Sequence, residues 1–167
     1  MVWILLICIV SVLGIRWINH LYWEDKFTKS IYASQTSSTL RETLNDPGRA
    51  GEAGVYFALQ GFEEEGAKFL FNLYIPKPDG QTTEIDILMI SRSGIFVYES
   101  KNYSGWIFGD ERRRYWYQTL YAGRGRSAHK EPFYNPVMQN AGHIRHLKKN
   151  SWTGYPDYVG DCIFRQV

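Results

Sequence analysis

The sequence predicts an α/β or α+β domain, a three-layer sandwich with a central mixed β-sheet flanked by helices, preceded by an N-terminal apolar helix. Two observations carry this prediction. Segments with helical and strand patterns follow one another in the order helix, four strands, helix, strand. The first residues, in contrast, form a long run without charge. A chain of 167 residues is long enough for one such domain with an appendage.

The N-terminal segment is the most distinctive feature of the composition. Residues 2–15 carry no charge, and the partly aromatic stretch WINHLYW follows Arg16. A helix needs about 20 residues to cross a bilayer core of about 30 Å, and residues 17–23 extend the apolar run to that length. Residues 1–23 are therefore expected to form a transmembrane anchor. The alternatives are a cleaved signal peptide, which lacks a basic first region and a small-residue cleavage site here, and a buried helix.

Basic residues follow the anchor, which predicts its orientation. Arg16, Lys26 and Lys29 all lie after the apolar run, so the positive-inside bias places the rest of the chain in the cytoplasm, as a single-pass protein of the cell membrane. Residues 24–48 are polar and end in a turn, and they are expected to form a linker or a short helix. The globular domain is then expected to occupy residues 49–167.

The globular part divides into elements by pattern and by turn chemistry. A helix over 48–62 has Glu52, Tyr56 and Leu59 on one stripe, and a second helix over 135–150 starts with Asn135 as N-cap and Pro136 in its first turn. The strands and loops are assigned by composition: strands at 68–75, 84–91, 94–101, 112–120 and 160–167, and loops at 103–109 and 122–132.

The central hairpin, EIDILMISRSGIFVYESK over 84–101, is apolar in its middle and charged at its outer ends. If Ser91 faces Gly94 across a two-residue loop, counting outward places Asp86 opposite Glu99, with Lys101 on the same face. Opposed carboxylates repel each other, and a divalent cation with hard oxygen ligands, Mg²⁺ or Mn²⁺, would relieve that conflict. The alternative is a pair of solvated strand ends with an ordinary surface ion pair.

Composition limits the other classes of site. The net charge of +2 does not indicate binding to nucleic acid by bulk electrostatics, and two unpaired cysteines do not indicate a disulfide framework or a cysteine zinc site. A local basic rim that contacts phosphates, or else a solvated loop, is expected from Arg112, Arg113, Arg114, Arg124, Arg126 and Lys130. On the second helix, Gln139 and His143 share one stripe with His146, and the first two are expected to face the metal cleft.

Four stretches, GEAG (51–54), EIDILMI (84–90), GIFVYESKNYSGWIFG (94–109) and FYNPVMQNAGHI (133–144), together resemble the nuclease-related domain, NERD. The resemblance covers the chain from about residue 48 to its end, and the family's domain extends slightly beyond Val167. NERD is in turn similar to restriction-endonuclease-like enzymes with a D…(D/E)-x-K signature, which implies a restriction-endonuclease-like core and a nuclease-derived function.

The resemblance also implies roles for particular residues. Asp86 matches the signature acid, Glu99 and Lys101 match the E-x-K, Glu52 matches an additional acid of the family, and Gln139 matches a helix glutamine. A metal would be held by Asp86, Glu99 and the backbone carbonyl of Ser100, and Lys101 would position or deprotonate the attacking water. The expected function is a metal-dependent DNA nuclease. The alternatives are a module that binds nucleic acid without cutting it and a protein that uses the fold only for interaction.

Overall fold

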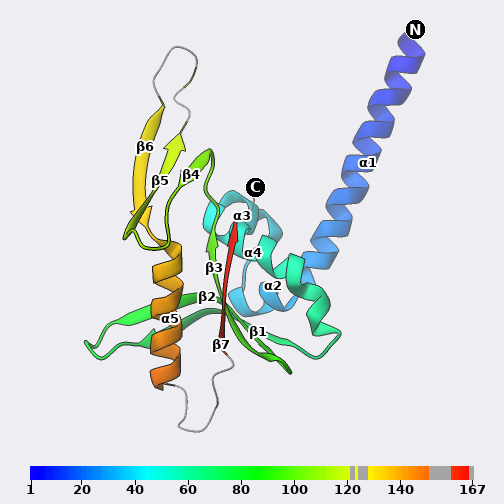
Figure 1. Cartoon of the computed structure of the whole chain (residues 1–167). Coiled ribbons are helices and arrows are strands. Elements are labelled where there is room, and N and C mark those ends of the chain that lie inside the picture. The colour runs from blue at the N-terminus through cyan, green and yellow to red at the C-terminus, as the bar shows by residue number, and fades with distance from the viewer. Residues whose placement is uncertain (121–122, 124–127, 151–158, 166–167) are drawn as a thin grey trace.

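The computed structural model describes residues 1–120, 123, 128–150 and 159–165 (Figure 1). The helices are α1 (Val2–Thr28), α2 (Ile31–Thr36), α3 (Leu40–Asn45), α4 (Pro47–Leu59), the 3₁₀ turn η1 (Gln60–Glu63) and α5 (Pro136–Asn150). The strands are β1 (Lys68–Pro76), β2 (Thr82–Ser91), β3 (Gly94–Lys101), β4 (Trp106–Phe108), β5 (Tyr115–Leu120), β6 (His129–Tyr134) and β7 (Val159–Arg165). This α+β layout is the fold class predicted from the sequence.

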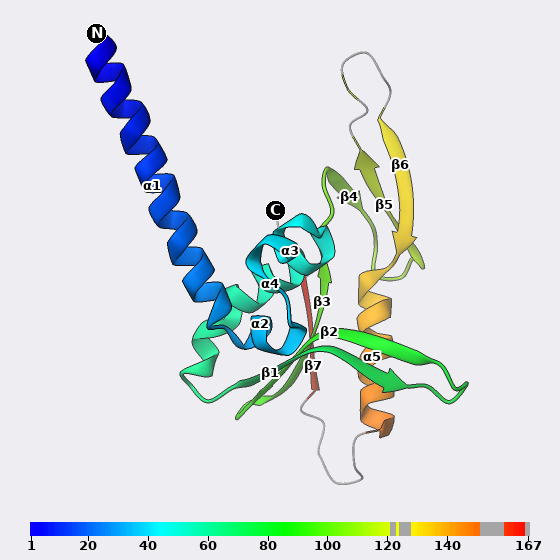
Figure 2. The same ribbon diagram turned by 180° about the vertical axis from the view of Figure 1, so that it is seen from behind.

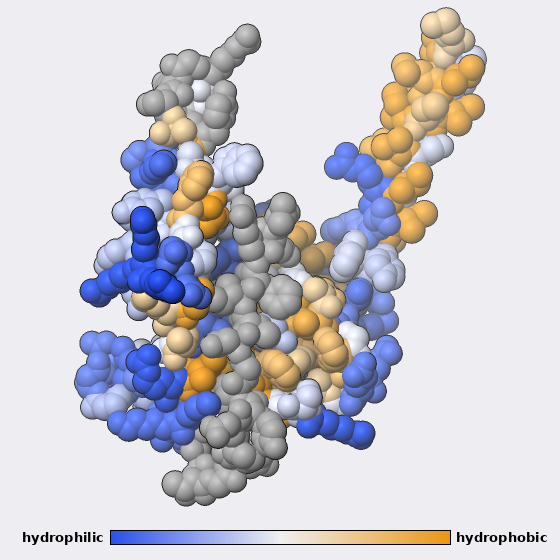
Figure 3. Space-filling model, viewed as in Figure 1, coloured by the Kyte–Doolittle hydropathy of each residue, from blue (hydrophilic) through white to orange (hydrophobic). Residues whose placement is uncertain are grey.

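Helix α1 extends away from the body of the molecule (Figures 1 and 2). Its 27 residues correspond to about 40 Å at 1.5 Å per residue, and its apolar window has a mean hydropathy of 2.1 with none of it buried. Figure 3 shows these apolar residues standing free of the rest of the chain. By length and composition α1 can span a membrane, and the alternative of a buried helix does not hold in this structure.

The segment predicted as a linker or short helix, residues 24–48, is largely helical. Ser30 caps α2, and Thr39 caps α3 through a capping box with Glu42, so each short helix satisfies donors at its first turn. Tyr32 and Leu40 from these helices belong to the buried core. This segment therefore packs onto the globular part in addition to joining it to α1.

The main sheet has the strand order β1-β2-β3-β7 and is mixed, as predicted. β1, β2 and β3 are antiparallel neighbours, whereas β7 pairs with β3 in parallel. The hairpin register is also the predicted one, because Ser91 faces Gly94 across the turn. The pairs Ile90 with Ile95 and Leu88 with Val97 follow in order. The two-residue turn at Arg92 and Ser93 was enough to predict this register, since the length of a hairpin loop determines which residues pair.

Helices cover both faces of the main sheet. On one face the core is formed by α2, by α4 and by the strand residues that point toward them. Its members include Tyr56 from α4, Phe69 from β1 and Ile87 from β2. On the other face α5 contributes Ile144, which packs with Leu88 and Val97. Consecutive hairpin residues thus enter two different cores, which explains why β2 and β3 are apolar on both sides.

A second, three-stranded sheet, which we call the arm, consists of β4, β5 and β6 and projects from the body (Figures 1 and 2). Three predictions were wrong here. Residues 103–109, predicted as a loop, contain β4, and residues 122–132, also predicted as a loop, contain the start of β6. The strand predicted over 112–120 begins at Tyr115 and belongs to the arm. Most residues of β6 are exposed, so this strand lacks the apolar alternation by which strands are detected.

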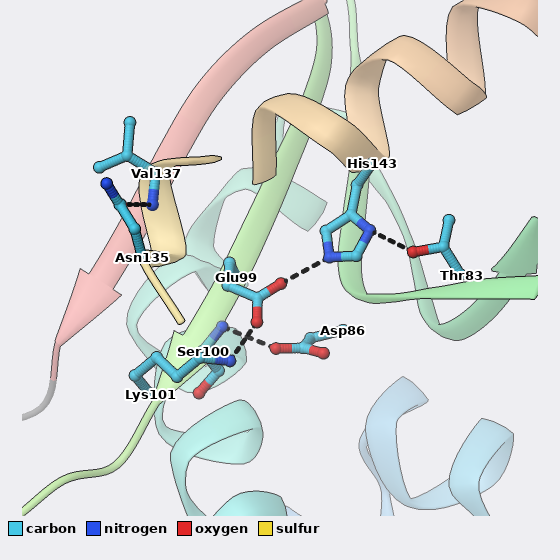
Figure 4. Close-up of polar contacts among 8 residues, drawn as sticks. All are labelled: Thr83, Asp86, Glu99, Ser100, Lys101, Asn135, Val137 and His143. Carbon is cyan, nitrogen blue, oxygen red and sulfur yellow. Dashed lines mark hydrogen bonds and ion pairs between the residues drawn. The ribbon is translucent and has the colours of Figure 1, made fainter. Parts of the chain in front are cut away.

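Asn135 joins the arm to α5. Its Oδ1 accepts hydrogen bonds from the backbone N–H groups of Val137, at 2.9 Å, and Met138, at 3.3 Å, and so caps α5 as predicted (Figure 4). Its Nδ2 donates to the carbonyl oxygens of Glu111, at 3.0 Å, and Arg113, at 2.7 Å. One fully buried side chain therefore satisfies both the first turn of α5 and the turn before β5.

Replacing this side chain is expected to destabilise the chain. Asn135→Ala removes a helix cap and leaves buried carbonyl oxygens without their donor, at a cost of roughly 2 to 4 kcal/mol in the free energy of unfolding. Urea denaturation of the full chain in detergent micelles measures this loss. The matched control is Asn150→Ala at the exposed end of α5, which should cost well under half as much. Equal losses at both positions would contradict the role given to Asn135.

Candidate functional site

The charged ends of β2 and β3 lie at the end of the hairpin away from its turn, between α4 and α5 (Figure 4). The paired residues of β2 and β3 run from Ser91 with Gly94 at the turn to Ile87 with Tyr98. Asp86 and Glu99 are the next residue outward on each strand, which is the juxtaposition that the sequence predicted. The hairpin therefore brings two carboxylates together where its ladder of paired residues stops.

Glu99 is the centre of this arrangement, and its side chain is fully buried. Its Oε1 forms an ion pair with Nζ of Lys101, and its Oε2 lies 2.9 Å from Nε2 of His143. Because an ionised carboxylate only accepts hydrogen bonds, Nε2 of His143 is the donor. The prediction that Lys101 shares the face of Glu99 is confirmed, and so is the expectation that His143 faces this site.

His143 is held in turn by Thr83, near the start of β2. The hydroxyl oxygen of Thr83 lies 2.8 Å from Nδ1 of His143, so that in a neutral imidazole this nitrogen accepts the hydroxyl proton (Figure 4). The imidazole is thereby fixed between two strands by both of its nitrogens. Sequence analysis did not identify Thr83, because no local pattern shows that a threonine on β2 lies opposite a histidine on α5.

The side chain of Asp86 is hydrogen-bonded to the backbone of β3. Its Oδ2 accepts a hydrogen bond of 2.7 Å from the N–H of Ser100. Burial, and then repulsion by Glu99, raise the pKa of Asp86 to about 6, and this rise is only partly offset by the Ser100 N–H and by Lys101. The predicted conflict between the two carboxylates is therefore present in the folded chain.

Glu52 on α4 adds a third carboxylate to the site. Burial raises its pKa to about 7, and repulsion by Asp86 contributes to the rise. The hydroxyl of Tyr32 donates to its Oε2 at 3.2 Å. Tyr32 comes from α2, in the segment expected to form a linker or a short helix, so no sequence pattern placed its side chain at this site.

A close approach of α4 to β3 brings Glu52 to the site. A Cβ atom on Gly51 would lie 2.8 Å from Oγ of Ser100 and 3.0 Å from Cβ of Asn102, closer than side chains normally pack. Asn102 also donates from its Nδ2 to the carbonyl oxygen of Pro47 at 2.8 Å. Glycine is thus required at position 51 for steric reasons, because α4 begins directly against the end of β3.

Other predicted residues are less closely tied to this cluster. Gln139 lies half-buried on α5, one turn before His143. Among the described residues, its side chain forms no hydrogen bond with the cluster. Arg124 and Arg126 lie outside the described residues. Asn140, which sequence analysis did not single out, is fully buried and donates from Nδ2 to the carbonyl oxygen of Val97 at 3.1 Å.

The cluster has the chemistry of an acid-rich polar site with one lysine. Three carboxylates influence one another, and the cations around them are Lys101 and, where protonated, His143. Within the part of the chain that the structure describes, no three acidic, histidine or cysteine side chains are arranged as a ready-made metal cage. The raised pKa values of Asp86 and Glu52 reflect negative charge that is incompletely offset, a condition common at functional sites.

Comparisons with known proteins agree with this geometry. A family model described as nuclease-related domain (NERD) matches residues 47–164, from the first residue of α4 into β7. The chain is also 36% identical over 101 residues to an uncharacterised protein of Bacillus anthracis, a match that covers 60% of this chain and 45% of the relative. It thus spans less than half of that relative's length. No solved structure matches the chain.

The raised pKa of Glu52 predicts a pH-dependent effect on stability. Because the folded state binds this proton more tightly than the unfolded state, the protonated carboxyl favours folding at low pH, and this contribution is lost as pH rises through about 7. In EDTA, Glu52→Gln should therefore match the wild type near pH 4. At about pH 8 it should be more stable by about 1 to 2 kcal/mol, after allowance for solvent screening. Urea denaturation at both pH values measures the difference.

Glu42 provides a control of opposite sign. Hydrogen bonds from the backbone and hydroxyl of Thr39 lower the pKa of this exposed carboxyl. Its stabilising effect is present above its unfolded pKa and is lost as pH falls, so Glu42→Gln should lose stability relative to the wild type at neutral pH. If both variants changed in the same direction, Glu52 would not carry the buried charge assigned to it.

Proposed function

Because this chain belongs to the nuclease-related domain (NERD) family, we propose that it is a membrane-anchored endonuclease that hydrolyses DNA phosphodiester bonds with Mg²⁺ or Mn²⁺. The observation that carries the proposal is the cluster of Asp86 and Lys101 around the buried carboxylate of Glu99, with Glu52 beside it. These residue types occur at the D…E-x-K positions of the family resemblance, and the fold brings them to one place.

The carboxylates are of the donor type that suits a hard divalent cation, although the described side chains are not already arranged as a metal cage. Asp86 and Glu52 carry charge that the surrounding groups do not fully offset, and carboxylate oxygens are the preferred ligands of Mg²⁺ and Mn²⁺. We assign the metal to Asp86, Glu99 and the backbone carbonyl of Ser100. When bound, such an ion supplies a Lewis acid that acidifies the attacking water and offsets charge on the phosphate.

The chain's own residues have distinct roles in this proposal. Lys101 orients or deprotonates the attacking water, or stabilises the negative charge that develops on the phosphate. His143 and Thr83 hold the Glu99 carboxylate in one orientation. Glu52, whose pKa is raised to about 7, accepts a proton near neutral pH or holds a second ion.

One observation favours a second candidate, a module that binds nucleic acid without cutting it. Both carboxylate oxygens of Glu99 are already engaged within the chain, one by Lys101 and one by His143. A site that keeps these contacts leaves Glu99 only one lone pair on each oxygen for a metal ion, which weakens its case as a ligand. Cleavage requires Lys101 to exchange this ion pair for contacts with water or phosphate.

The test is cleavage of supercoiled plasmid by the full chain in detergent micelles with Mn²⁺. The wild type should nick or linearise the plasmid, whereas Lys101→Ala and Glu99→Gln should cleave at least about 100-fold more slowly. Lys77→Ala, which removes a half-buried lysine of the β1–β2 turn, serves as the matched control and should cleave like the wild type. Binding of plasmid without cleavage by the wild type would favour the second candidate.

Metal binding is measured separately by thermal unfolding of Asp86→Asn. Without metal this variant should melt at the same temperature as the wild type or higher, because one of the opposed charges is removed. Mn²⁺ should raise the melting temperature of the wild type only, since the ion binds the folded arrangement of carboxylates. An Asp86→Asn chain that still cuts DNA and is still stabilised by Mn²⁺ would overturn the proposed site.

We further propose that α1 anchors the chain in the cell membrane with the domain in the cytoplasm. The full chain should remain with membranes after a carbonate wash, and protease added outside intact cells should spare the domain. Val12→Asp, near the middle of the apolar run, costs about 3 kcal/mol of insertion and should shift the chain toward the soluble fraction. A mature chain that lacks residues 1–23 would instead indicate a cleaved signal sequence.

A further inference from the structure

The arm presents an aromatic face to solvent. Directly paired residues of antiparallel strands point to the same side, so the register of the arm defines this face. Phe108 pairs with Tyr117, and Tyr115 pairs with Tyr134. The five rings of the face, between 41% and 75% exposed, are Trp106, Phe108, Tyr115, Tyr117 and Tyr134. Isolated exposed rings need no explanation, but five on one side of a small sheet do.

The opposite side of the arm has its own packing. Phe133 contacts Tyr103 with ring centroids 4.4 Å apart and Trp116 with centroids 6.3 Å apart. The indole N–H of Trp116 donates to the carbonyl oxygen of Asp110 at 2.9 Å, and the ring lies where a side chain on Gly109 would otherwise be. The arm is therefore packed on one side by residues outside the aromatic face. The rings of the aromatic face are not needed for that packing and can contact a ligand.

Cations accompany the exposed rings. The guanidinium of Arg114 lies 5.7 Å from the centroid of Tyr115, and the ammonium of Lys130 lies 5.3 Å from that of Phe108. Arg112 and Arg113 are exposed beside them. Within the described chain these four cations form no ion pair with a carboxylate. A ligand for this surface should therefore be flat, apolar on its faces and negatively charged along its length.

The arm is also connected to the carboxylate site at both of its ends. The strand that carries Glu99 and Lys101 continues through four residues, 102–105, into β4, and β6 leads through Asn135 into the helix that carries His143 (Figure 1). The arm and the carboxylate site are thus joined by short segments of the chain, and of the two kinds of ligand only a long polymer could contact both.

We propose that the aromatic face binds a single strand of DNA, with unpaired bases stacked on its rings and phosphates paired with the arginines and Lys130. Each base offers an aromatic surface for stacking only when it is unpaired, so a duplex cannot use this face in the same way. The inference rests on the proposed function, because the strand so held is the one presented to Glu99 and Lys101. It extends that function by selecting DNA with single-stranded segments.

A membrane surface is the other macromolecular ligand that exposed tryptophan, tyrosine and lysine residues suit. Two observations favour DNA. Arginines come three in a row immediately before β5, and phosphate groups spaced along a strand match such a run. The short connection between the arm and the carboxylate site suits a DNA strand that is to be cut there, whereas binding to a lipid surface would not require it.

The test is fluorescence anisotropy of a labelled 20-nucleotide DNA strand with the full chain in EDTA, where cleavage plays no part. The wild type should bind the single strand more tightly than the matching duplex or a strand without bases. Trp106→Ala and Tyr117→Ala should each weaken single-strand binding about fivefold or more, because one stacking contact is lost. Phe62→Ala, which removes an exposed ring of η1 outside the arm, is the matched control and should bind normally.

The remaining outcomes separate this inference from the proposed nuclease activity. A wild type that binds the single strand but does not cut plasmid counts against the nuclease activity alone and leaves the inference intact. Unchanged binding by Trp106→Ala and Tyr117→Ala would overturn it, even if the plasmid is cleaved. Tighter binding of an RNA strand of the same sequence would overturn the choice of DNA. Binding that is lost in phosphatidylcholine–phosphatidylglycerol nanodiscs would assign the rings to the membrane instead.

Discussion

The rest of the site depends on one constraint, the burial of the Glu99 carboxylate in the middle of the protein. A buried charge without partners is costly, so the chain supplies one partner from its own strand, Lys101, and one from α5, His143. His143 in turn requires Thr83 on its other nitrogen. The position of α5 over the sheet is therefore set by polar contacts as well as by the apolar contacts of Ile144.

The same constraint explains why two further carboxylates have raised pKa values. Lys101 and His143 are engaged with Glu99, and they only partly offset the effects of burial and repulsion on Asp86. Asp86 then repels Glu52. The packing keeps these groups together despite the repulsion, because α4 is held against β3 by Gly51 and by the hydrogen bond from Asn102. A cluster that costs stability and is nevertheless enforced by the fold is typical of a functional site.

The arm and the cluster form one continuous unit through short connections. Asn135 caps the helix that carries His143 and also holds the turn that precedes β5, so movement of the arm and movement of α5 are linked by a single buried side chain. The two small sheets therefore serve different purposes. The main sheet encloses charge between two cores, whereas the arm leaves its aromatic side exposed.

The sequence by itself determined the features that depend on local pattern. The two-residue turn of Arg92 and Ser93 determined the hairpin register, and with it the meeting of Asp86, Glu99 and Lys101, because counting outward from a turn of known length pairs the residues of the two strands. The N-cap at Asn135 and the apolar helix α1 could also be predicted, because capping depends on a few neighbouring residues and hydropathy on one continuous segment.

Only the tertiary structure decided which distant residues complete the site. Thr83 and Tyr32 reach it from β2 and α2 because packing brings those elements together, and no local signal marks either residue. The strands β4 and β6 were missed because their side chains are largely solvent-exposed, so they lack the buried alternation that reveals a strand. The pattern of apolar residues in one segment indicates which of its side chains are buried. It does not indicate which other segment they contact, because those contacts form only when the chain folds.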